Sequence, residues 1–221
     1  MIPLRDINPS RTLPLLTGLI ILINVIIFVQ NYEEGVLFEE RIYELGYVPA
    51  LGFSWERAIS SMFMHGGWLH LFFNMWTLWV FGDNVEDRLG KVGYALLYFL
   101  SGVGALFLHV ALYPSSEVPV VGASGAISGV MGAYLVLFPQ ARVWTWIPPF
   151  YFTELSAKFF LVLWLLIQLT EGIVGRIREW MIEGEASGVA FWAHIGGFVV
   201  GWVIARVWPK EGRGEDWKYV G

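Results

Sequence analysis

The sequence contains no cysteine, which excludes a disulfide framework, a thiol nucleophile and a cysteine-based zinc site. Charged residues are scarce as well, at 15% of the 221 residues, against about a quarter in soluble domains. The 14 Lys and Arg and the 19 Asp and Glu give a net charge of −5, and the cations form no basic stripe of the kind that binds nucleic acid. No nucleic-acid partner is therefore expected.

What the chain has in excess is apolar surface: 56% of its residues are hydrophobic and the mean hydropathy is +0.58. A chain of this size has too little interior to hide that surface from water, so the excess is expected to face lipid. The composition excludes an ordinary soluble globule and a disordered chain. We therefore expect an all-α membrane protein in contact with the lipid bilayer.

Six apolar stretches are candidate membrane spans, since a transmembrane helix needs about 20 mostly apolar residues. They cover residues 13–29, 65–82, 92–112, 118–138, 158–174 and 189–208. The first stretch is predicted to be retained, because Asn31 to Glu34 follow it where a signal peptide would have a small-residue cleavage site. No internal repeat or separate soluble segment is evident, so residues 1–221 are predicted to form one membrane domain.

The positive-inside rule gives the orientation. With the N-terminus inside, ten of the 14 Lys and Arg fall on the cytoplasmic side. The four outside are Arg41, Arg57, Arg176 and Arg178. We predict a multi-pass protein of the cell membrane with both termini cytoplasmic. The first outer loop, residues 31–64, mixes acids with aromatic and aliphatic residues, which suits a segment lying in the membrane interface.

A polar layer is predicted in the second, fourth and sixth spans, which run in the same direction. His70, Ser124 and His194 lie five or six residues into these spans, which is roughly 7–9 Å below the outer boundary at about 1.5 Å per residue. Asn74 follows His70 by one helical turn and shares its face. Polar side chains inside a span are costly, so this layer, opening to the outer side, is the candidate functional site.

The chemistry that fits these groups is nucleophilic catalysis. A serine hydroxyl needs a neighbouring base to take its proton, and a neutral imidazole suits that task. Ser124 is therefore the candidate nucleophile and His194 the candidate base. The four Asp residues all lie outside the apolar stretches, so a Ser–His dyad is expected in place of a triad. No metal or cofactor is required.

An oxyanion hole is predicted beside Ser124. Gly122 and Gly125 flank the serine, so a substrate backbone can approach it. Near a helix start, the unpaired backbone N–H of Ser124 favours an oxyanion. His70 and Asn74 add side-chain donors from the neighbouring span.

The same residues allow other interpretations. Gly125 and Gly129, like Gly197 and Gly201, have the four-residue spacing by which membrane helices pack, so GxSG alone indicates a packing seam. A metal site built from the four histidines His65, His70, His109 and His194 lacks an HExxH motif and a ligating carboxylate. His65 is expected to be structural. A transporter would show polar groups at the midplane and an inverted repeat, and neither is seen.

Four sequence blocks resemble the rhomboid family of intramembrane serine proteases. They are FMHGGWLHLFFN from Phe63, GDNVEDRLG from Gly82, GASGAISGVMGAY from Gly122 and AHIGGF from Ala193, in the family's order. The resemblance implies a six-transmembrane-helix rhomboid-like bundle with a membrane-interfacial first outer loop. It assigns nucleophile and base to Ser124 and His194, and oxyanion stabilisation to His70 and Asn74.

The resemblance also implies roles for less conspicuous residues. Glu86 and Arg88 match a structural Glu-x-Arg element that braces the cytoplasmic loop. The fifth span and residues 175–188 correspond to a lateral gate and a cap. Ser128 stands where some members carry a tyrosine that packs on the catalytic histidine, so the orientation of His194 is left unexplained.

The function that follows is cleavage of transmembrane or juxtamembrane segments of other membrane proteins, which are the expected substrates. The alternative is a catalytically silent rhomboid-like scaffold or chaperone. The presence of both Ser124 and His194 disfavours that alternative.

Overall fold

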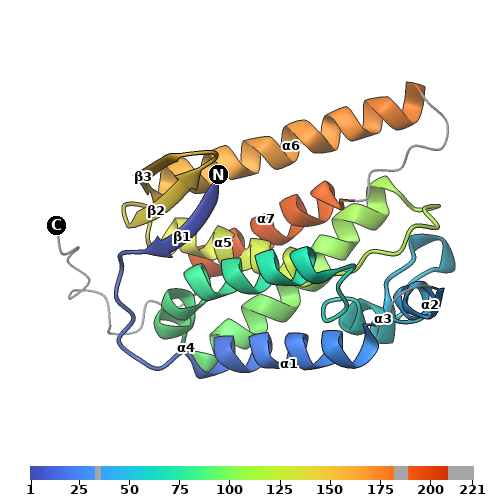
Figure 1. The fold of residues 1–221 in the computed structure, drawn as a ribbon, viewed down its shortest axis with the longest axis horizontal. Helices are drawn as coiled ribbons and strands as arrows, with labels where there is room; N and C mark the ends of the chain where they lie inside the picture. Colours follow the sequence, from blue (N-terminus) through green and yellow to red (C-terminus); the bar gives the residue numbers. More distant parts are fainter. Residues whose placement is uncertain (33–35, 182–188, 209–221) are drawn as a thin grey trace.

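The computed structural model describes residues 1–32, 36–181 and 189–208. Among them are five helices that run along a bundle: α1 (Leu15–Asn31), α4 (Trp68–Leu112), α5 (Ser124–Leu137), α6 (Ala157–Met181) and α7 (Phe191–Val207). A small sheet lies at one end of the bundle, and α2 (Val36–Leu45) and α3 (Trp55–Ser60) lie at the other (Figure 1). The first predicted outer loop therefore contains two helices, joined by a short 3-10 turn at Pro49–Leu51.

Helix α4 contains two of the predicted spans. Its 45 residues are interrupted at Gly90, which has non-helical angles of φ 70° and ψ 166°. A residue other than glycine would be strained at this positive φ. By length and composition, Trp68–Leu112 and Ala157–Glu179 can cross a membrane, whereas the apolar helices α1, α5 and α7 are shorter.

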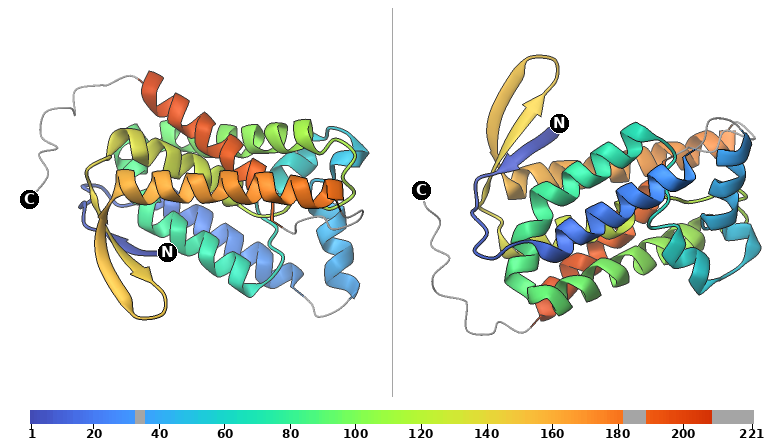
Figure 2. Two further views of the ribbon diagram at one scale, coloured as in Figure 1. Left: turned by 90° about the horizontal axis from the view of Figure 1, so that it is seen from above. Right: turned by 60° about the horizontal axis from the view of Figure 1, so that its bottom comes forward.

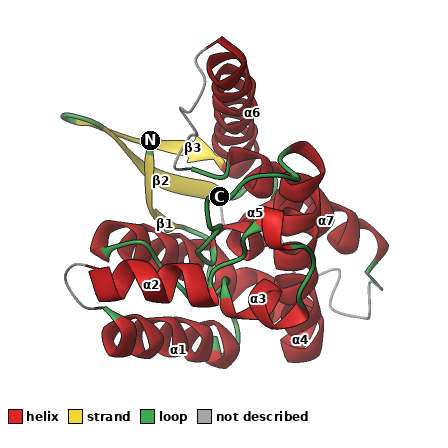
Figure 3. Cartoon of the chain, turned by 90° about the vertical axis from the view of Figure 1, so that its right-hand side faces the viewer, coloured by secondary structure: helices red, strands yellow, loops and turns green. Residues whose placement is uncertain are grey.

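Helix α6 lies along one side of the bundle (Figure 2). Seen from the end that carries α2 and α3, it lies on the side opposite α1 (Figure 3). The predicted span at 158–174 is too short, because α6 continues to Met181. Residues 175–181 of the predicted cap are therefore helical, and residues 182–188 lie outside the described part of the chain.

The expectation of an all-helical chain is wrong for two segments. Strands β1 (Ile2–Asp6), β2 (Arg142–Ile147) and β3 (Tyr151–Ser156) form an antiparallel sheet in the order β1-β2-β3. Strand β2 buries Val143 and Thr145 on one face, which is the two-residue period of a strand. Strands β2 and β3 are rich in β-branched and aromatic residues but lie between two apolar stretches, and β1 precedes the first stretch, so a search for spans overlooks all three.

The start of the fourth predicted span is also wrong. Helix α5 begins at Ser124, not near residue 118, and Ser124 is its first residue. The preceding segment is extended: Val120 pairs with Tyr47, and the Gly122 N–H donates a hydrogen bond to the Ser61 carbonyl at 2.8 Å. This segment leads the chain across the mouth of the candidate site before α5 begins.

The first turn of α1 is capped by another helix. Pro14, at the N-cap position, provides no side-chain hydrogen bond. The buried Glu86 carboxylate of α4 instead accepts hydrogen bonds from the Leu16 N–H at 2.9 Å and from both the N–H and hydroxyl of Thr17 at 2.8 Å. These bonds satisfy donors that a helix start leaves unpaired and join α1 to the bend of α4.

Replacing Glu86 by glutamine is expected to lower the free energy of unfolding by about 2–3 kcal/mol, because an amide NH₂ would face a buried N–H donor. Denaturation with sodium dodecyl sulfate, followed by tryptophan fluorescence, measures this difference. Glu56→Gln is the matched control, since Glu56 is exposed on α3. Equal stability of the two variants would contradict the capping role.

Asp6 connects the sheet to the helices. Its Oδ2 atom accepts hydrogen bonds from the Tyr134 hydroxyl of α5 at 2.6 Å and from the Asn84 amide of α4 at 2.7 Å. Burial raises the pKa of Asp6 to about 7, although the hydrogen bond from Tyr134 opposes the shift, and the nearby Asp83 adds to it. The folded protein therefore holds a proton here at pH values where an unfolded chain has released it.

This difference predicts that stability falls as pH rises. Between about pH 4 and pH 7 the folded state binds more protons than the unfolded state at Asp6, so the free energy of unfolding decreases with pH and levels off above about 7. Asp6→Asn should remove this part of the slope. Unfolding measured at pH 5 and pH 8 for both proteins tests it, and identical slopes would show that Asp6 does not titrate in this way.

Candidate active site

Helices α5 and α7 touch through their backbones at glycine residues. A Cβ atom at Gly197 would overlap the carbonyl group of Gly125, and one at Gly201 would overlap that of Gly129. The small-residue packing predicted for these positions is confirmed, and it allows the close approach that holds helices together in lipid. The seam brings the first turns of the two helices, with Ser124 and His194, side by side.

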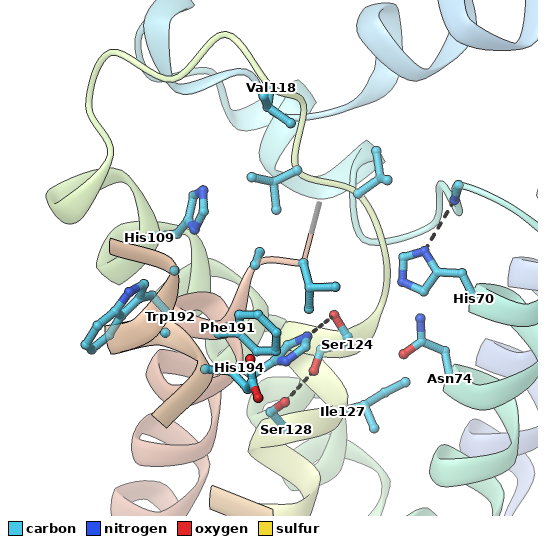
Figure 4. A pocket seen from close by; sticks show the side chains of 18 of the residues that line it. His70, Asn74, His109, Val118, Ser124, Ile127, Ser128, Phe191, Trp192 and His194 are labelled. Carbon is cyan, nitrogen blue, oxygen red and sulfur yellow. Dashed lines mark hydrogen bonds between the residues drawn. The ribbon is translucent and has the colours of Figure 1, made fainter. Parts of the chain in front are cut away.

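Ser124 and His194 are within hydrogen-bond distance. The Ser124 Oγ atom lies 2.8 Å from His194 Nε2 (Figure 4). On the other side of the ring, His194 Nδ1 lies 2.7 Å from Oε1 of Gln168 on α6. An amide oxygen only accepts hydrogen bonds, so Nδ1 carries the proton and Nε2 presents its lone pair to the serine hydroxyl. This is the tautomer that a general base requires.

Helix α6 also packs against the His194 ring. The ring of Trp164 lies 6.1 Å from it between centroids, and Phe191 of α7 lies 6.4 Å away at 87°. Trp164 and Gln168 are four residues apart and so share one face of α6. The Ser128 hydroxyl donates to the Ser124 carbonyl at 2.7 Å. The orientation of His194, unexplained by the sequence, thus comes from a tryptophan and a glutamine of α6.

His70 and Asn74 of α4 face the same space (Figure 4). The Gly66 N–H donates to His70 Nδ1 at 3.3 Å, which leaves the ring proton on Nε2. The Asn74 Nδ2 atom is buried and has no hydrogen-bond partner within the described part of the chain. Because buried donors are nearly always paired, an unpaired amide here is a donor available to a substrate oxygen.

Gly122 and His65 hold this side of the site. Gly122 has φ +116°, and a Cβ atom there would lie 2.7 Å from His70 Nε2, so both backbone conformation and space require glycine. The buried His65 ring packs on that of His70 at 5.1 Å between centroids. Gly125 is similarly constrained, because its Cβ would lie 2.6 Å from that of Ala105.

His70, Asn74, Ser124 and His194 line a cavity of about 610 Å³. Its walls combine these polar groups with apolar side chains such as Phe73, Ile127 and Met131, and its lining also includes Ser116, residues 118–121, and Glu171 and Glu179 of α6. The cavity lies toward the end of the bundle that carries α2 and α3, away from the sheet. It is large enough for several residues of an extended peptide.

Comparison with known families identifies the fold. The rhomboid domain matches residues 52–210, which is most of the chain. The chain belongs to the rhomboid family. It is a membrane protein with long apolar helices, and the matched region contains all the residues of the cavity named above.

Relatives of this rhomboid occur in plants and bacteria. RHOMBOID-like protein 5 of Arabidopsis thaliana is 31% identical over 185 residues, which are 80% of this chain and 54% of the relative. Rhomboid protease AarA of Providencia stuartii is 30% identical over 183 residues, 77% of this chain and 60% of the relative. Putative rhomboid protease YdcA of Bacillus subtilis is 35% identical over 104 residues, 46% of this chain and 50% of the relative. This rhomboid spans 54% of the length of RHOMBOID-like protein 5 and 33% of the length of RHOMBOID-like protein 4 of Arabidopsis thaliana.

The other predicted residues of this rhomboid lie apart from the dyad. Glu86 caps α1 as described, and Arg88, next to the α4 bend, lines a separate cavity near the sheet. His109 lines the mouth of the candidate site. Among the described residues, no group of three or more His, Cys, Asp and Glu could hold a metal ion.

Sequence reasoning missed Gln168 and Trp164. A signal for Gln168 existed, since it is an amide inside the predicted fifth span, where polar side chains are costly. Trp164 had no signal of its own, because an aromatic residue in a span is typical of lipid contact and helix packing.

Proposed function

We propose that this rhomboid is an intramembrane serine endopeptidase that cleaves transmembrane or juxtamembrane segments of other membrane proteins. The observation that carries the proposal is the 2.8 Å contact between Ser124 Oγ and His194 Nε2, with the opposite ring nitrogen 2.7 Å from the Gln168 amide oxygen. A serine aimed at the free nitrogen of an oriented imidazole has the arrangement of an activated nucleophile.

In acylation, His194 Nε2 takes the Ser124 proton as the hydroxyl oxygen attacks the scissile carbonyl carbon. The resulting tetrahedral oxyanion accepts hydrogen bonds from the Ser124 backbone N–H, from His70 Nε2–H and from the Asn74 amide. His194 then gives its proton to the leaving amine, and the peptide bond breaks. Water, activated in turn by His194, attacks the ester and releases the second fragment. No metal or cofactor takes part.

Gln168 is a positioning residue in this scheme. It does not touch substrate, but its amide oxygen accepts a hydrogen bond from His194 Nδ1–H, which keeps Nε2 deprotonated and directed at Ser124. The same contact stabilises the imidazolium that forms during acylation, because the amide dipole points its negative end at the charged ring.

The substrate must present an unwound backbone. A helix conceals its amides in hydrogen bonds, so a segment has to open locally before Ser124 can reach a carbonyl. We infer a preference for small or helix-breaking residues near the outer end of the substrate span. In this proposal residues 1–221 form one membrane domain with six spans and cytoplasmic termini, and the cavity opens to the outer side of the cell membrane.

The test is labelling and cleavage by purified full-length protein in liposomes. A fluorophosphonate should attach to Ser124, located by peptide mass spectrometry, and a single-span reporter carrying a Gly-Ala segment near its outer end should be cut. Absence of labelling in folded protein, together with intact reporters across a panel of span sequences, would favour the silent scaffold.

A further inference from the structure

A second cavity, of about 790 Å³, lies at the opposite end of the bundle from the dyad. We call it the basal groove. Leu135 of α5, which lines it, is eleven residues beyond Ser124, or about 16 Å along the helix.

Three cations from three helices meet at the basal groove. Arg88 is on α4, Lys158 on α6 and Arg206 on α7, and within the described ranges no Asp or Glu lines the groove. The helix ends also bear partial charges: α5 and α7 finish here, each contributing about −0.5, while the start of α6 contributes about +0.5. These partial charges are too small to neutralise three full positive charges, so the described lining of the groove is net positive.

The rest of the basal groove is apolar. Leu135, Val136 and Val162 form aliphatic walls, and Trp202 and Trp208 supply indole rings. The guanidinium of Arg206 lies over the Trp202 ring, 4.3 Å from its centroid. This cation–π contact holds one positive charge at the edge of an apolar surface. A small water-soluble anion would use only the cations, whereas an amphipathic anion would use the cations and the walls together.

The position of the groove in the fold indicates which class of amphipathic anion it binds. It lies where α5 and α7 end and α6 begins, which is the level at which helices leave the hydrocarbon and lipid headgroups are found. Basic pockets between membrane helices are suited to anionic headgroups. We propose that the basal groove binds an anionic phospholipid from the surrounding bilayer, with the phosphate at Arg88, Lys158 and Arg206 and an acyl chain along the aliphatic walls.

Such a lipid would connect the start of α6 to α4 and α7. Lys158 belongs to α6, which also carries Gln168 of the candidate site, whereas Arg88 and Arg206 belong to α4 and α7. A phosphate between them would fix the base of α6 against the bundle. The proposal does not depend on the peptidase function, because it concerns binding alone.

Native mass spectrometry of the full-length protein, with phosphatidylglycerol or phosphatidylcholine added in detergent, tests the proposal. The wild type should retain one phosphatidylglycerol and discriminate against phosphatidylcholine. The double variant Lys158→Gln, Arg206→Gln should bind phosphatidylglycerol at least about tenfold more weakly. The matched control, Lys91→Gln, Arg142→Gln, removes two exposed cations outside the groove lining and should bind as the wild type does.

Each other outcome overturns the proposal. If both double variants bound phosphatidylglycerol equally weakly, the binding would depend on the general surface charge and not on the groove. Unchanged binding in the groove variant would mean that the groove is empty or is covered by another part of the chain, such as residues 209–221. Displacement of the lipid by glycerol phosphate at equal concentration would mean that the apolar walls add nothing. Thermal unfolding of each variant without added lipid checks that all are folded.

Discussion

Replacing Ser124 by alanine will abolish cleavage of a single-span reporter in liposomes, with a fall of at least about a thousandfold, which is the scale seen when a serine nucleophile is removed. The reason is that, among the described residues, the hydroxyl within hydrogen-bond distance of His194 Nε2 is that of Ser124, whose Oγ lies 2.8 Å away. Cleavage by wild type and Ser124→Ala, measured at equal protein in the same vesicles, gives the ratio.

His194→Ala should cause a loss of the same order, and the double variant should be no worse than either single variant. Residues that act as one unit are strongly non-additive, since removing either one disables the other. Additive losses would mean that Ser124 and His194 contribute separately. That result would contradict a dyad even if each single variant were inactive.

The matched control for Ser124→Ala is Ser128→Ala, one turn further along α5. Its hydroxyl donates to the Ser124 carbonyl and does not face His194 Nε2. Removing a hydroxyl from a helix that keeps its own backbone bonds should change the cleavage rate less than about tenfold. Full retention of activity by Ser124→Ala, in protein that unfolds like the wild type, would remove the serine from the mechanism.

The residues of the candidate site could be identified in the sequence because polar side chains have a high free-energy cost inside a membrane. His70, Asn74, Ser124 and His194 are polar side chains inside apolar stretches, and the structure brings all four to one cavity. The prediction that these groups lie at equal depth along three helices is only partly right, however. Ser124 begins α5 and is preceded by an extended segment, so its depth along a helix was not what placed it near His194. The glycine seam between α5 and α7 does that.

The sheet and the cap of α1 depend on contacts that a hydropathy pattern does not predict. Strands β2 and β3 lie between spans and pair with each other, and β2 also pairs with β1, more than a hundred residues away in sequence. Glu86 resembled a family element, but its hydrogen bonds to Leu16 and Thr17 depend on how α1 meets the bend of α4. Contacts between distant segments are set by tertiary packing, and no local pattern encodes them.

Gln168 provides the second large expected effect. Gln168→Met keeps the length and most of the shape of the side chain but removes the acceptor for His194 Nδ1. Without this acceptor, the tautomer of His194 with its proton on Nδ1 is no longer favoured over the tautomer with its proton on Nε2. The ring also loses its directional contact with α6. We expect kcat to fall about ten- to a hundredfold, the range for residues that orient a functional histidine, while KM changes little because Gln168 does not touch substrate.

Gln168→Glu separates positioning from packing. Glutamate keeps an acceptor oxygen at the same distance from the backbone, so it should recover most of the activity that methionine loses. The rate of fluorophosphonate labelling at Ser124 measures the competence of the dyad without any contribution from substrate binding, and it should follow the same order of wild type, glutamate and methionine.

Ile167→Met is the control on the same helix, since Ile167 is 43% exposed and lies on another face of α6. It should label and cleave as the wild type does. If methionine and glutamate at position 168 were equally impaired, the residue would act only by filling space. If methionine had no effect, Trp164 and Phe191 alone would be enough to orient His194. The predicted order of wild type, glutamate and methionine therefore requires that the neutral amide of Gln168 fixes the tautomer of His194. In a Ser-His-Asp triad a carboxylate fixes the tautomer of the base.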